Sequence, residues 1–433
     1  MGSKTVNILL LVTSSISVKV IGKLIASLTD DGHKLRTYYT KNASIMHHHY
    51  HQTKDDSPAT YEFANEFDTY CWNKSVPHID DVEWADICLV CPADYNILGK
   101  AANGIADDFV STVIAAWLGS GKPMWMAEAM NPMMYLNKVR IGNREKLESL
   151  GVKFIEPTVK KLACGDYGIG GLADVRAVKN IAVDGVRWIQ PIAPKGLLGA
   201  TETIYLSSSM WAVQRMSGPK ATKIRKNFSF AEYLPKAEEP GAFGAKRKYD
   251  RHEGVDIYCY YGSEVHAVED GEVVDAYQYT GTKETGEWWN PTWCIKVKGK
   301  SGVVTYGELQ MPDECPMVVD FGKDPKVNLS AAKVKFQYPP IGTKIKAGEL
   351  IGFVGKVLPD EKRRDDIRNH NNCMLHLELR TESCHLDGWK LDGDRDRKLL
   401  DPTPYLKTAV MHEDAAERWQ NGYFTAQPKW AKE

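Results

Sequence analysis

The chain has 433 residues, of which 43% are apolar and 26% are charged, and its formal net charge is −1. This length predicts two or three domains, each able to bury its own core. The near-zero charge excludes a general attraction to nucleic acid or to anionic membranes. Nine irregularly spaced cysteines favour reduced thiols over a disulfide framework. The first apolar run, at 6–12, is too short to span a bilayer and lacks a cleavage site. We therefore expect a cytoplasmic protein without a membrane or nucleic-acid partner.

Residues 1–185 alternate apolar strands with helical patterns. The pattern predicts a strand at 6–12, an amphipathic helix at 18–28, and further strands in KLRTYYT, ICLVCP, PMWMAEAM and VKFIEP. Strands separated by helices predict an α/β fold with a Rossmann-like parallel sheet covered on both faces. Ligands of such sheets bind outside the carboxyl ends of the strands. We therefore expect functional residues in four segments: 13–17, 40–44, 92–97 and 128–135.

Two clusters in this part invite a metal or redox interpretation. Cys88 and Cys91 form a CxxC motif, but they lie in the apolar run DICLVCP and face opposite sides of a strand. We therefore predict that both are core residues. The run HHHYH, at 47–51, is predicted to lie in an exposed polar loop without fixed ligand geometry.

The remaining chain has a different texture. Residues 186–245 mix proline, glycine and a basic run, which predicts a connector with some ordered pieces and a solvated face. Short strands with glycine turns at 246–410 predict a compact, mainly antiparallel β domain, and 411–433 is expected to be a C-terminal tail. The three tryptophans of EWWNPTW in this domain either expose their rings to a sugar or a partner, or pack beneath an insertion.

Four stretches of the first part follow the order seen in one known family. They are LVTSSISVKVIGKLI, VPHIDDVEWADICLVCPADYNILGKAANGIADDFVST, AEAMNPMMY and LACGDYGIGGLAD. Together they resemble the homo-oligomeric flavin-containing cysteine decarboxylases, the phosphopantothenoylcysteine decarboxylase-like flavoproteins, over about residues 5–180. The resemblance implies FMN as the cofactor, a small-molecule or peptide thiol as the substrate, and a homotrimer or dodecamer.

The expected FMN contacts lie at strand ends and helix starts. Residues 13–15 close a strand and open a helix, where hydroxyls and backbone N–H groups form an anion cradle for the flavin phosphate or simply cap the helix. By resemblance, Ser111 and Thr112 open a run toward the flavin, although a helix surface explains them equally well. The cofactor-binding residues expected are Ser14, Ser15, Thr40, Asn96, Ser111 and Thr112.

The motif AEAMNPMMY implies a carboxylate clamp by the same resemblance. Amides orient a carboxylate without adding a proton to the balance, although asparagine also commonly caps turns. The family's motif begins with proline and ends in tryptophan, whereas this chain has Glu128 and Tyr135 in those places. We expect the charge of Glu128, near the clamp, to disfavour phosphopantothenoylcysteine. The substrate-binding residues expected are Asn96, Ala129, Met130 and Asn131.

The resemblance also implies the reaction. His78, in VPHID, takes the thiol proton, although a lone histidine is commonly just a solvated side chain. Flavin takes a hydride from the carbon beside sulfur, and carbon dioxide leaves from the resulting thioaldehyde. Cys164, in LACGDYGIGG, supplies a proton on the return to a saturated thiol. His78, Asn131 and Cys164 are therefore the catalytic residues expected.

The stretch RHEGVDIYCYYGSEVHAVEDGEVV resembles the opening of the lysostaphin-type zinc endopeptidases, whose signature is His-x-Gly-x-Asp. The resemblance implies zinc held by three residues with one position left for water: His252, Asp256 and His376. Met374 and Glu308 replace the family's two further histidines, which predicts an inactive domain that contacts a cell-wall peptide or glycan. Two alternatives stay open, a hydrogen-bonded remnant without metal and an active zinc endopeptidase in which Glu308 is the base.

We hypothesise an FMN-dependent decarboxylase of a cysteine-containing substrate, phosphopantothenoylcysteine-like or peptidyl cysteine, followed by an inactive peptidase-like domain. The alternative is a non-enzymatic structural or cell-wall-binding protein, for example a component of a phage particle, that keeps both folds. The fusion of a cytosolic flavin fold to a wall-hydrolase fold is the observation behind this alternative.

Overall fold

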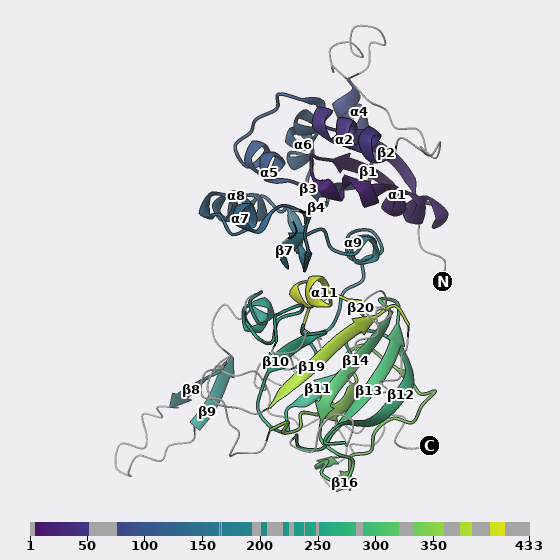
Figure 1. The fold of residues 1–433 in the computed structure, drawn as a ribbon, viewed down its shortest axis with the longest axis vertical. Coiled ribbons are helices and arrows are strands. Elements are labelled where there is room, and N and C mark those ends of the chain that lie inside the picture. The colour runs from purple at the N-terminus through teal and green to yellow at the C-terminus, as the bar shows by residue number, and fades with distance from the viewer. Residues whose placement is uncertain are drawn as a thin grey trace, which may run out of the picture. The chain divides into compact units, whose positions relative to one another are not determined.

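The computed structural model describes most of the chain, which divides into two compact units, Met1–Val186 and Arg187–Glu433 (Figure 1). The residues described are 5–51, 76–163, 165, 167–192, 201–205, 220–224, 229–237, 239–247, 251–282, 289–319, 333–358, 373–382 and 399–411. Within these ranges, every helix is too short or too polar to cross a membrane.

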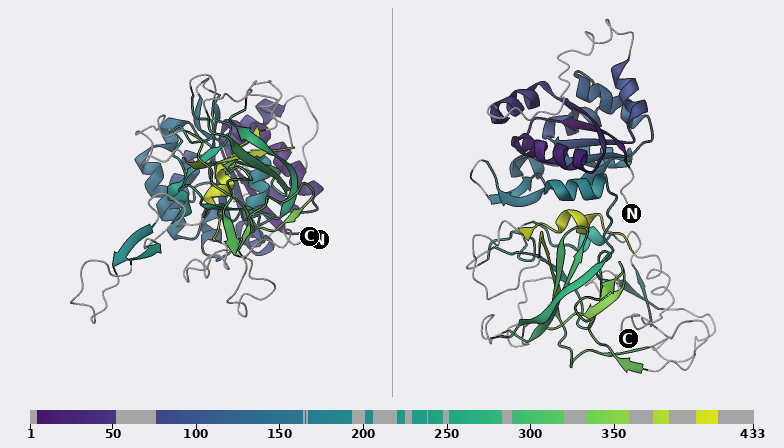
Figure 2. Two further views of the ribbon diagram at one scale, coloured as in Figure 1. Left: turned by 90° about the horizontal axis from the view of Figure 1, so that it is seen from below. Right: turned by 90° about the vertical axis from the view of Figure 1, so that its right-hand side faces the viewer.

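The N-terminal unit is built on a five-stranded parallel sheet in the order β2-β1-β3-β4-β5. This confirms the predicted α/β class. The strands alternate along the chain with helices, and helices lie on both faces of the sheet (Figure 2). The strands are β1 (Asn7–Val12), β2 (Lys34–Tyr39), β3 (Ile87–Ala93), β4 (Met124–Glu128) and β5 (Lys153–Ile155). The helices are η1 (Ile16–Val20), α1 (Ile21–Asp30), α2 (Lys41–His51), α4 (Pro77–Trp84), α5 (Tyr95–Ala102), α6 (Phe109–Leu118), α7 (Pro132–Tyr135), α8 (Lys138–Ser149) and α9 (Val175–Ala182).

The central strands are buried because both of their faces are covered. Cys88 and Cys91 have no exposed surface and are free thiols, which confirms the core prediction for the CxxC motif. The histidine run at 47–51 lies in helix α2, so the prediction of a loop was wrong. Four histidines and a tyrosine give little apolar periodicity, and this hid a helix that begins at Lys41.

A β-hairpin follows β5 and carries the glycine-rich motif on its second strand. Its strands are β6 (Thr158–Lys161) and β7 (Tyr167–Gly171). The Met130 N–H donates to the Gly170 carbonyl at 2.9 Å, and a Cβ on Gly168 would lie 3.1 Å from the ring of Pro132. The glycines therefore let the hairpin backbone approach the loop after β4 closely.

The C-terminal unit contains a seven-stranded antiparallel sheet, as predicted for a mainly antiparallel β domain. Its order is β10-β19-β14-β13-β12-β17, and β20 also pairs with β19. The strands are β10 (Val255–Tyr258), β12 (Gly271–Thr280), β13 (Thr292–Gly299), β14 (Val303–Leu309), β17 (Lys344–Ile345), β19 (Met374–Arg380) and β20 (Leu399–Leu400). Three two-stranded pairs and two short helices complete it: β8 (Thr201–Tyr205) with β9 (Lys220–Ile224), β11 (Glu264–His266) with β18 (Leu350–Phe353), β15 (Met317–Val319) with β16 (Lys333–Lys335), η3 (Phe230–Tyr233) and α11 (Thr403–Lys407).

From Arg187 on, the described parts of the predicted connector belong to this unit. Trp188 is fully buried, stacks on Tyr405 with ring centroids 4.8 Å apart, and donates to Ser301 Oγ at 2.9 Å. Phe230 is also buried. Isolated large apolar residues, which show no periodicity in the sequence, therefore fasten this segment to the β domain.

The tryptophan-rich loop is described in part. Trp289 and Trp293 are half-buried, and Trp293 lies 6.1 Å from the ring of Tyr338. Trp288 lies outside the described residues. For Trp293 the packing alternative therefore applies.

Candidate functional site

The predicted phosphate contacts Ser14 and Thr40 meet at the carboxyl edge of the N-terminal sheet. Ser14 follows β1 and Thr40 follows β2, and these strands are hydrogen-bonded neighbours in register. Their hydroxyl oxygens lie 3.2 Å apart, and both residues are half-buried. Two hydroxyls at the end of a parallel sheet suit a phosphate oxygen, which accepts from both.

The predicted amide cradle is partly used within the chain. The Ser14 N–H donates to the Asp94 carboxylate at 3.0 Å, and the Ser15 N–H donates to the Thr13 carbonyl at 2.9 Å. Ser15 Oγ accepts from the Ser17 N–H at 3.4 Å and so caps η1, which is the alternative role considered for it. Burial raises the pKa of the Asp94 carboxyl, although its hydrogen bonds oppose that rise. A ligand at this edge would therefore bind the hydroxyls of Ser14 and Thr40 more than these two amides.

His78 is the second residue of α4 and is half-buried. The helix is fixed to the sheet by Arg36 on β2, whose guanidinium contacts Asp81 at 2.6 Å and lies 4.3 Å above the Trp84 ring. In the same C-terminal half of the helix, Lys122 Nζ donates to carbonyls of residues 82, 83 and 85 at 2.7, 3.1 and 2.8 Å. The imidazole therefore stands on a well-anchored helix.

Asn131 lies where the loop after β4 enters α7. Its side-chain oxygen accepts from the Met133 N–H at 2.9 Å, so it caps the helix, as the ordinary interpretation predicted. Ala129 and Met130 precede it and are buried. Because Met130 is hydrogen-bonded to Gly170, the clamp motif and the glycine-rich motif are neighbours in space. Cys164, between Lys161 and Tyr167 in the sequence, lies outside the described residues.

The other predicted flavin contacts are more scattered. Asn96 is exposed on α5. Ser111 is buried and forms a capping box with Asp108, and Thr112 Oγ1 donates to the Asp108 carbonyl at 2.9 Å. The hydroxyls of Ser111 and Thr112 are therefore used in hydrogen bonds at the N-terminus of α6.

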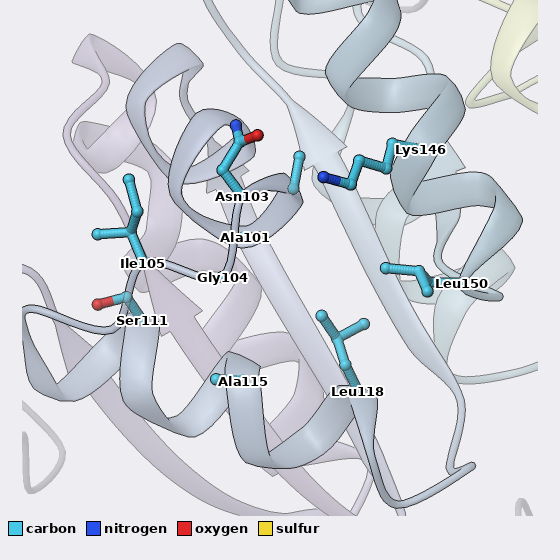
Figure 3. A pocket seen from close by; sticks show the side chains of 10 residues that line it. Ala101, Asn103, Gly104, Ile105, Ser111, Ala115, Leu118, Lys146 and Leu150 are labelled. Atoms are coloured by element: carbon cyan, nitrogen blue, oxygen red, sulfur yellow. The ribbon is translucent and has the colours of Figure 1, made fainter.

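Ser111 also lines a cavity of about 310 Å³ between α5, α6 and the end of α8 (Figure 3). Its lining is mostly aliphatic, with Asn103, Ser111 and Lys146 as polar members. Ser14, Ser15 and Thr40 are not among the residues that line it. This cavity and the strand-end hydroxyls are therefore separate features.

Glu128 has a different role from the one expected. Its side chain is fully buried and both carboxylate oxygens are bound by Arg140 and Arg144 of α8. The prediction that its charge acts on the substrate was therefore wrong, because two guanidiniums compensate that charge. Sequence patterns missed these arginines, since α8 is otherwise an ordinary polar helix.

In the C-terminal unit, the three predicted zinc ligands do come together. Asp256 on β10 and His376 on β19 are directly opposed across the sheet. His376 Nδ1 lies 2.7 Å from Asp256 Oδ1, and His252 Nε2 lies 3.1 Å from both of these atoms. All three side chains are buried. The three groups thus present one cluster that could hold a metal ion.

Gly254 in the signature allows this convergence. A Cβ there would lie 2.7 Å from the Leu377 carbonyl and 2.8 Å from the His376 ring. Such contacts are too short for any side chain. Only a glycine therefore fits between His252 and Asp256 at this close approach to β19.

Outer contacts orient the two imidazoles. His252 Nδ1 faces the Ala242 carbonyl at 3.0 Å, and His376 Nε2 faces the Glu378 carboxylate at 3.1 Å. Burial acts to lower the pKa of His376, but hydrogen bonds to Asp256 and Glu378 raise it to about 10. Burial lowers the pKa of His252. Sequence reasoning missed Glu378, although its two-residue spacing from His376 on one strand face is the signal that could have found it.

Glu308 and Met374, which stand in place of the family's two further histidines, lie on the neighbouring strands β14 and β19. Glu308 is buried with φ = 63°, a left-handed conformation that is uncommon outside glycine. Met374 lies two residues before His376 on β19, so both side chains face the same side. Burial, and then the negative charge of Asp256, raises the pKa of Glu308 to about 8.

Comparisons with known proteins concern the N-terminal unit. A family model described as Flavoprotein matches residues 2–187. The chain is 33% identical over 171 residues to the phosphopantothenoylcysteine decarboxylase of Mus musculus, covering 39% of this chain and 80% of that protein. It is 40% identical over 115 residues to phosphopantothenoylcysteine decarboxylase HAL3 of Malus domestica, covering 26% of this chain and 53% of that protein.

A solved structure described as the FMN binding protein AtHal3 is 28% identical, with a TM-score of 0.36, covering 42% of this chain and 99% of that one. The chain spans about half the length of the Malus protein and of other plant relatives that it matches.

The contact between the two motifs predicts a strong effect of Gly170→Ala. Gly170 has φ = 126°, and a Cβ there would lie 2.0 Å from the Met130 carbonyl oxygen. We expect the change to lower the free energy of unfolding by about 1–3 kcal/mol, measured by urea titration with circular dichroism. Gly22→Ala, at a helical position with nothing within 4 Å, is the control and should be neutral or stabilising by up to about 1 kcal/mol. Equal midpoints for the two variants would contradict the close approach.

Proposed function

The chain belongs to the flavoprotein family that includes phosphopantothenoylcysteine decarboxylases, and on that premise we propose that its N-terminal unit is an FMN-dependent decarboxylase. The substrate carries a cysteinyl thiol, either as phosphopantothenoylcysteine or at the end of a peptide. The observation that carries the proposal is the hydrogen bond from Met130 to Gly170. It brings the asparagine motif and the glycine-rich motif together at the carboxyl edge of a parallel sheet, where such sheets bind ligands.

The residues at this edge fit FMN. The adjoining hydroxyls of Ser14 and Thr40 would hold its phosphate, with Ser15 beside them at the start of η1. FMN, when bound, accepts a hydride from the substrate carbon beside sulfur. Asn96, Ser111 and Thr112 remain proposed contacts on sequence grounds. In this structure, however, the hydroxyls of Ser111 and Thr112 already bond to Asp108.

Three residues have proposed roles in the chemistry. His78 accepts the thiol proton, since a neutral imidazole can do so near neutral pH. Asn131 donates its amide N–H to the substrate carboxylate, because its side-chain oxygen is already used by the Met133 N–H and its NH₂ group supplies the donors. Cys164 is the proposed proton donor to the product. With its neighbours Ala129 and Met130, Asn131 forms the floor of this substrate site.

We also propose that the protein is a homotrimer or dodecamer. The residues after Asn131 support a contact between copies, because Met133, Leu136 and Val139 are 82%, 54% and 62% exposed. Large apolar side chains that gather at the surface mark interaction sites. A cytoplasmic location and the absence of nucleic-acid and membrane partners stay predictions.

The purified protein is expected to be yellow, with the absorbance of bound flavin. Ser14→Ala combined with Thr40→Val should reduce FMN affinity at least tenfold, because the phosphate loses two hydroxyl donors of roughly 1 kcal/mol each. Equilibrium dialysis against FMN measures the affinity. Thr29→Val is the control, since that hydroxyl bonds only within α1 to the Ile25 carbonyl. A colourless protein that does not take up FMN would contradict the proposal and favour the structural, phage-component alternative.

His78→Asn should abolish decarboxylation while FMN stays bound. Loss of a general base lowers rates by about 10²–10⁴-fold, and asparagine cannot accept the thiol proton at neutral pH. Carbon dioxide release from phosphopantothenoylcysteine and from a cysteine-ended peptide, at matched flavin content, is the measurement. His48→Asn on the exposed part of α2 is the matched control. Equal rates in the two variants would remove His78 from the mechanism.

For the C-terminal unit we propose a peptidase-like domain that binds zinc without the family's peptidase histidines. The tautomers of the two imidazoles support this. Ala242 O can only accept, so His252 holds its proton on Nδ1, and the Glu378 carboxylate likewise keeps a proton on Nε2 of His376. In the metal-free cluster His376, whose pKa is raised to about 10, also carries a proton on Nδ1 and donates it to Asp256 Oδ1 at 2.7 Å. Zinc would displace that proton, and the two inner nitrogens and the Asp256 carboxylate would then be its three ligands.

The geometry also suits zinc. Bonds of about 2.0–2.1 Å in a tetrahedral site place neighbouring ligand atoms about 3.3 Å apart, and the inner atoms here are 2.7–3.1 Å apart. Carbonyl and carboxylate partners on the outer nitrogens are the usual support of zinc-bound histidines. Three protein ligands leave a fourth position for water. A contact with cell-wall peptide or glycan is the role we propose for such a site.

Zinc content should follow the three ligands. The full chain, stripped with chelator and titrated with Zn²⁺, is expected to bind one ion tightly and to gain thermal stability, since the ion binds only the folded unit. His252→Ala and Asp256→Asn should each weaken binding at least a hundredfold, whereas His48→Ala, in the histidine run of α2, should leave it unchanged. Unchanged affinity in His252→Ala, or no binding at all, would favour the hydrogen-bonded remnant.

A further inference from the structure

The loop that carries Asn131 begins and ends in one buried ionic network. Glu128, the last residue of β4, is fully buried, and Tyr135, the last residue of α7, is 7% exposed. These are the two places where the motif departs from the proline and tryptophan of the family. The two departures are therefore the two ends of the same loop.

Arg140 of α8 joins the two ends directly. Its Nε donates to Glu128 Oε1 at 2.7 Å, and a second guanidinium nitrogen contacts Oε2. The same guanidinium lies 3.9 Å above the Tyr135 ring. A planar guanidinium can pair with a carboxylate along its edge while its face covers an aromatic ring. Arg140 therefore contacts both ends of the loop.

A second bridge runs through Glu156 and Arg144. The Tyr135 hydroxyl donates to Glu156 Oε2 at 2.6 Å. Arg144 contacts Glu156 at 2.6 Å and Glu128 at 2.9 Å. The buried part of the network holds two carboxylates and two guanidiniums, so its buried charges balance, and the half-exposed Glu148 pairs with Arg144 at the rim. A balanced buried network keeps its geometry, because losing one member leaves an uncompensated charge.

We infer that Glu128 and Tyr135 are positioning residues that hold the Asn131 amide toward the substrate carboxylate. The inference rests on the proposed decarboxylase function. Between the two anchors, the loop is held by two backbone hydrogen bonds, from Ala129 to Ala93 O at 3.0 Å and from Met130 to Gly170 O at 2.9 Å. Asn131 is then positioned by the two ionic anchors and by these backbone hydrogen bonds. The arginines compensate the charge that Glu128 introduces.

The test compares Glu128→Gln with Glu148→Gln in the full-length, FMN-loaded protein. Glu148 also pairs with Arg144, at 2.8 Å, but its side chain is 45% exposed, so it is a matched control at the rim of the network. Glu128→Gln should keep FMN and raise KM for a cysteine-ended peptide at least tenfold. Binding of the same peptide ending in cysteamine, which has no carboxylate, should change less than twofold. Glu148→Gln should change neither.

A mutant cycle with Asn131→Ala distinguishes positioning from stability. If Glu128 acts through Asn131, Glu128→Gln adds less than twofold to KM in the Asn131→Ala background. Additive effects, or equal weakening of both peptides, would overturn the inference. Should Glu128→Gln not fold, Tyr135→Phe keeps the ring beneath Arg140 and removes only the hydroxyl. It should show the same pattern at about threefold, and no change there would also overturn the inference.

Failure of the proposed function gives a different result. If the wild-type protein releases no carbon dioxide from either substrate, the decarboxylase proposal fails, and the network is tested by amide hydrogen exchange of the full chain. Glu128→Gln should then speed exchange at Met130 and Met133 at least tenfold relative to Glu148→Gln. Equal exchange in the two variants would overturn the positioning role independently of any activity.

Discussion

The N-terminal unit depends on the parallel arrangement of its five strands, β1 to β5, in one sheet. Parallel strands bring all of their carboxyl ends to one edge, so Ser14 after β1, Thr40 after β2 and Asn131 beyond β4 gather there although long segments separate them. The antiparallel hairpin of β6 and β7 then folds against the loop after β4. Its glycines allow backbone contact where a side chain would have kept the two motifs apart.

Buried charge is handled in the same way in both units. In the N-terminal unit, two arginines of α8 compensate Glu128 and Glu156. In the C-terminal unit, a chain of contacts runs from Asp256 through His376 to Glu378 and on to Arg380. The first network balances its charges with its own side chains. In the second, protonated His376 lies between two carboxylates, and the proposed zinc ion would take the place of the proton that His376 donates to Asp256.

The two candidate sites differ in how their parts are assembled. The proposed zinc ligands come from one signature and one neighbouring strand, and direct cross-strand pairing places Asp256 opposite His376. The flavin and substrate contacts come from several loops, whose relative placement requires the whole sheet. A single substitution such as Gly254→Ala would disturb the first locally, whereas the second depends on the entire N-terminal core.

The sequence by itself determined the α/β class, the antiparallel β domain and the core position of Cys88 and Cys91, because apolar periodicity and strand length report burial directly. The resemblance to the zinc-endopeptidase signature also pointed to His252, Asp256 and His376 as one group, and the structure brings their side chains together. The helix at 47–51 escaped prediction because its apolar pattern is weak.

Only the tertiary structure showed that Glu128 is compensated by Arg140 and Arg144, and that Asn131 lies beside Gly170. It also showed that the Trp188 ring stacks on Tyr405 in the β domain. Long-range partners of this kind leave no periodic signal, because a charge or an aromatic ring in a sequence does not specify what will pack against it.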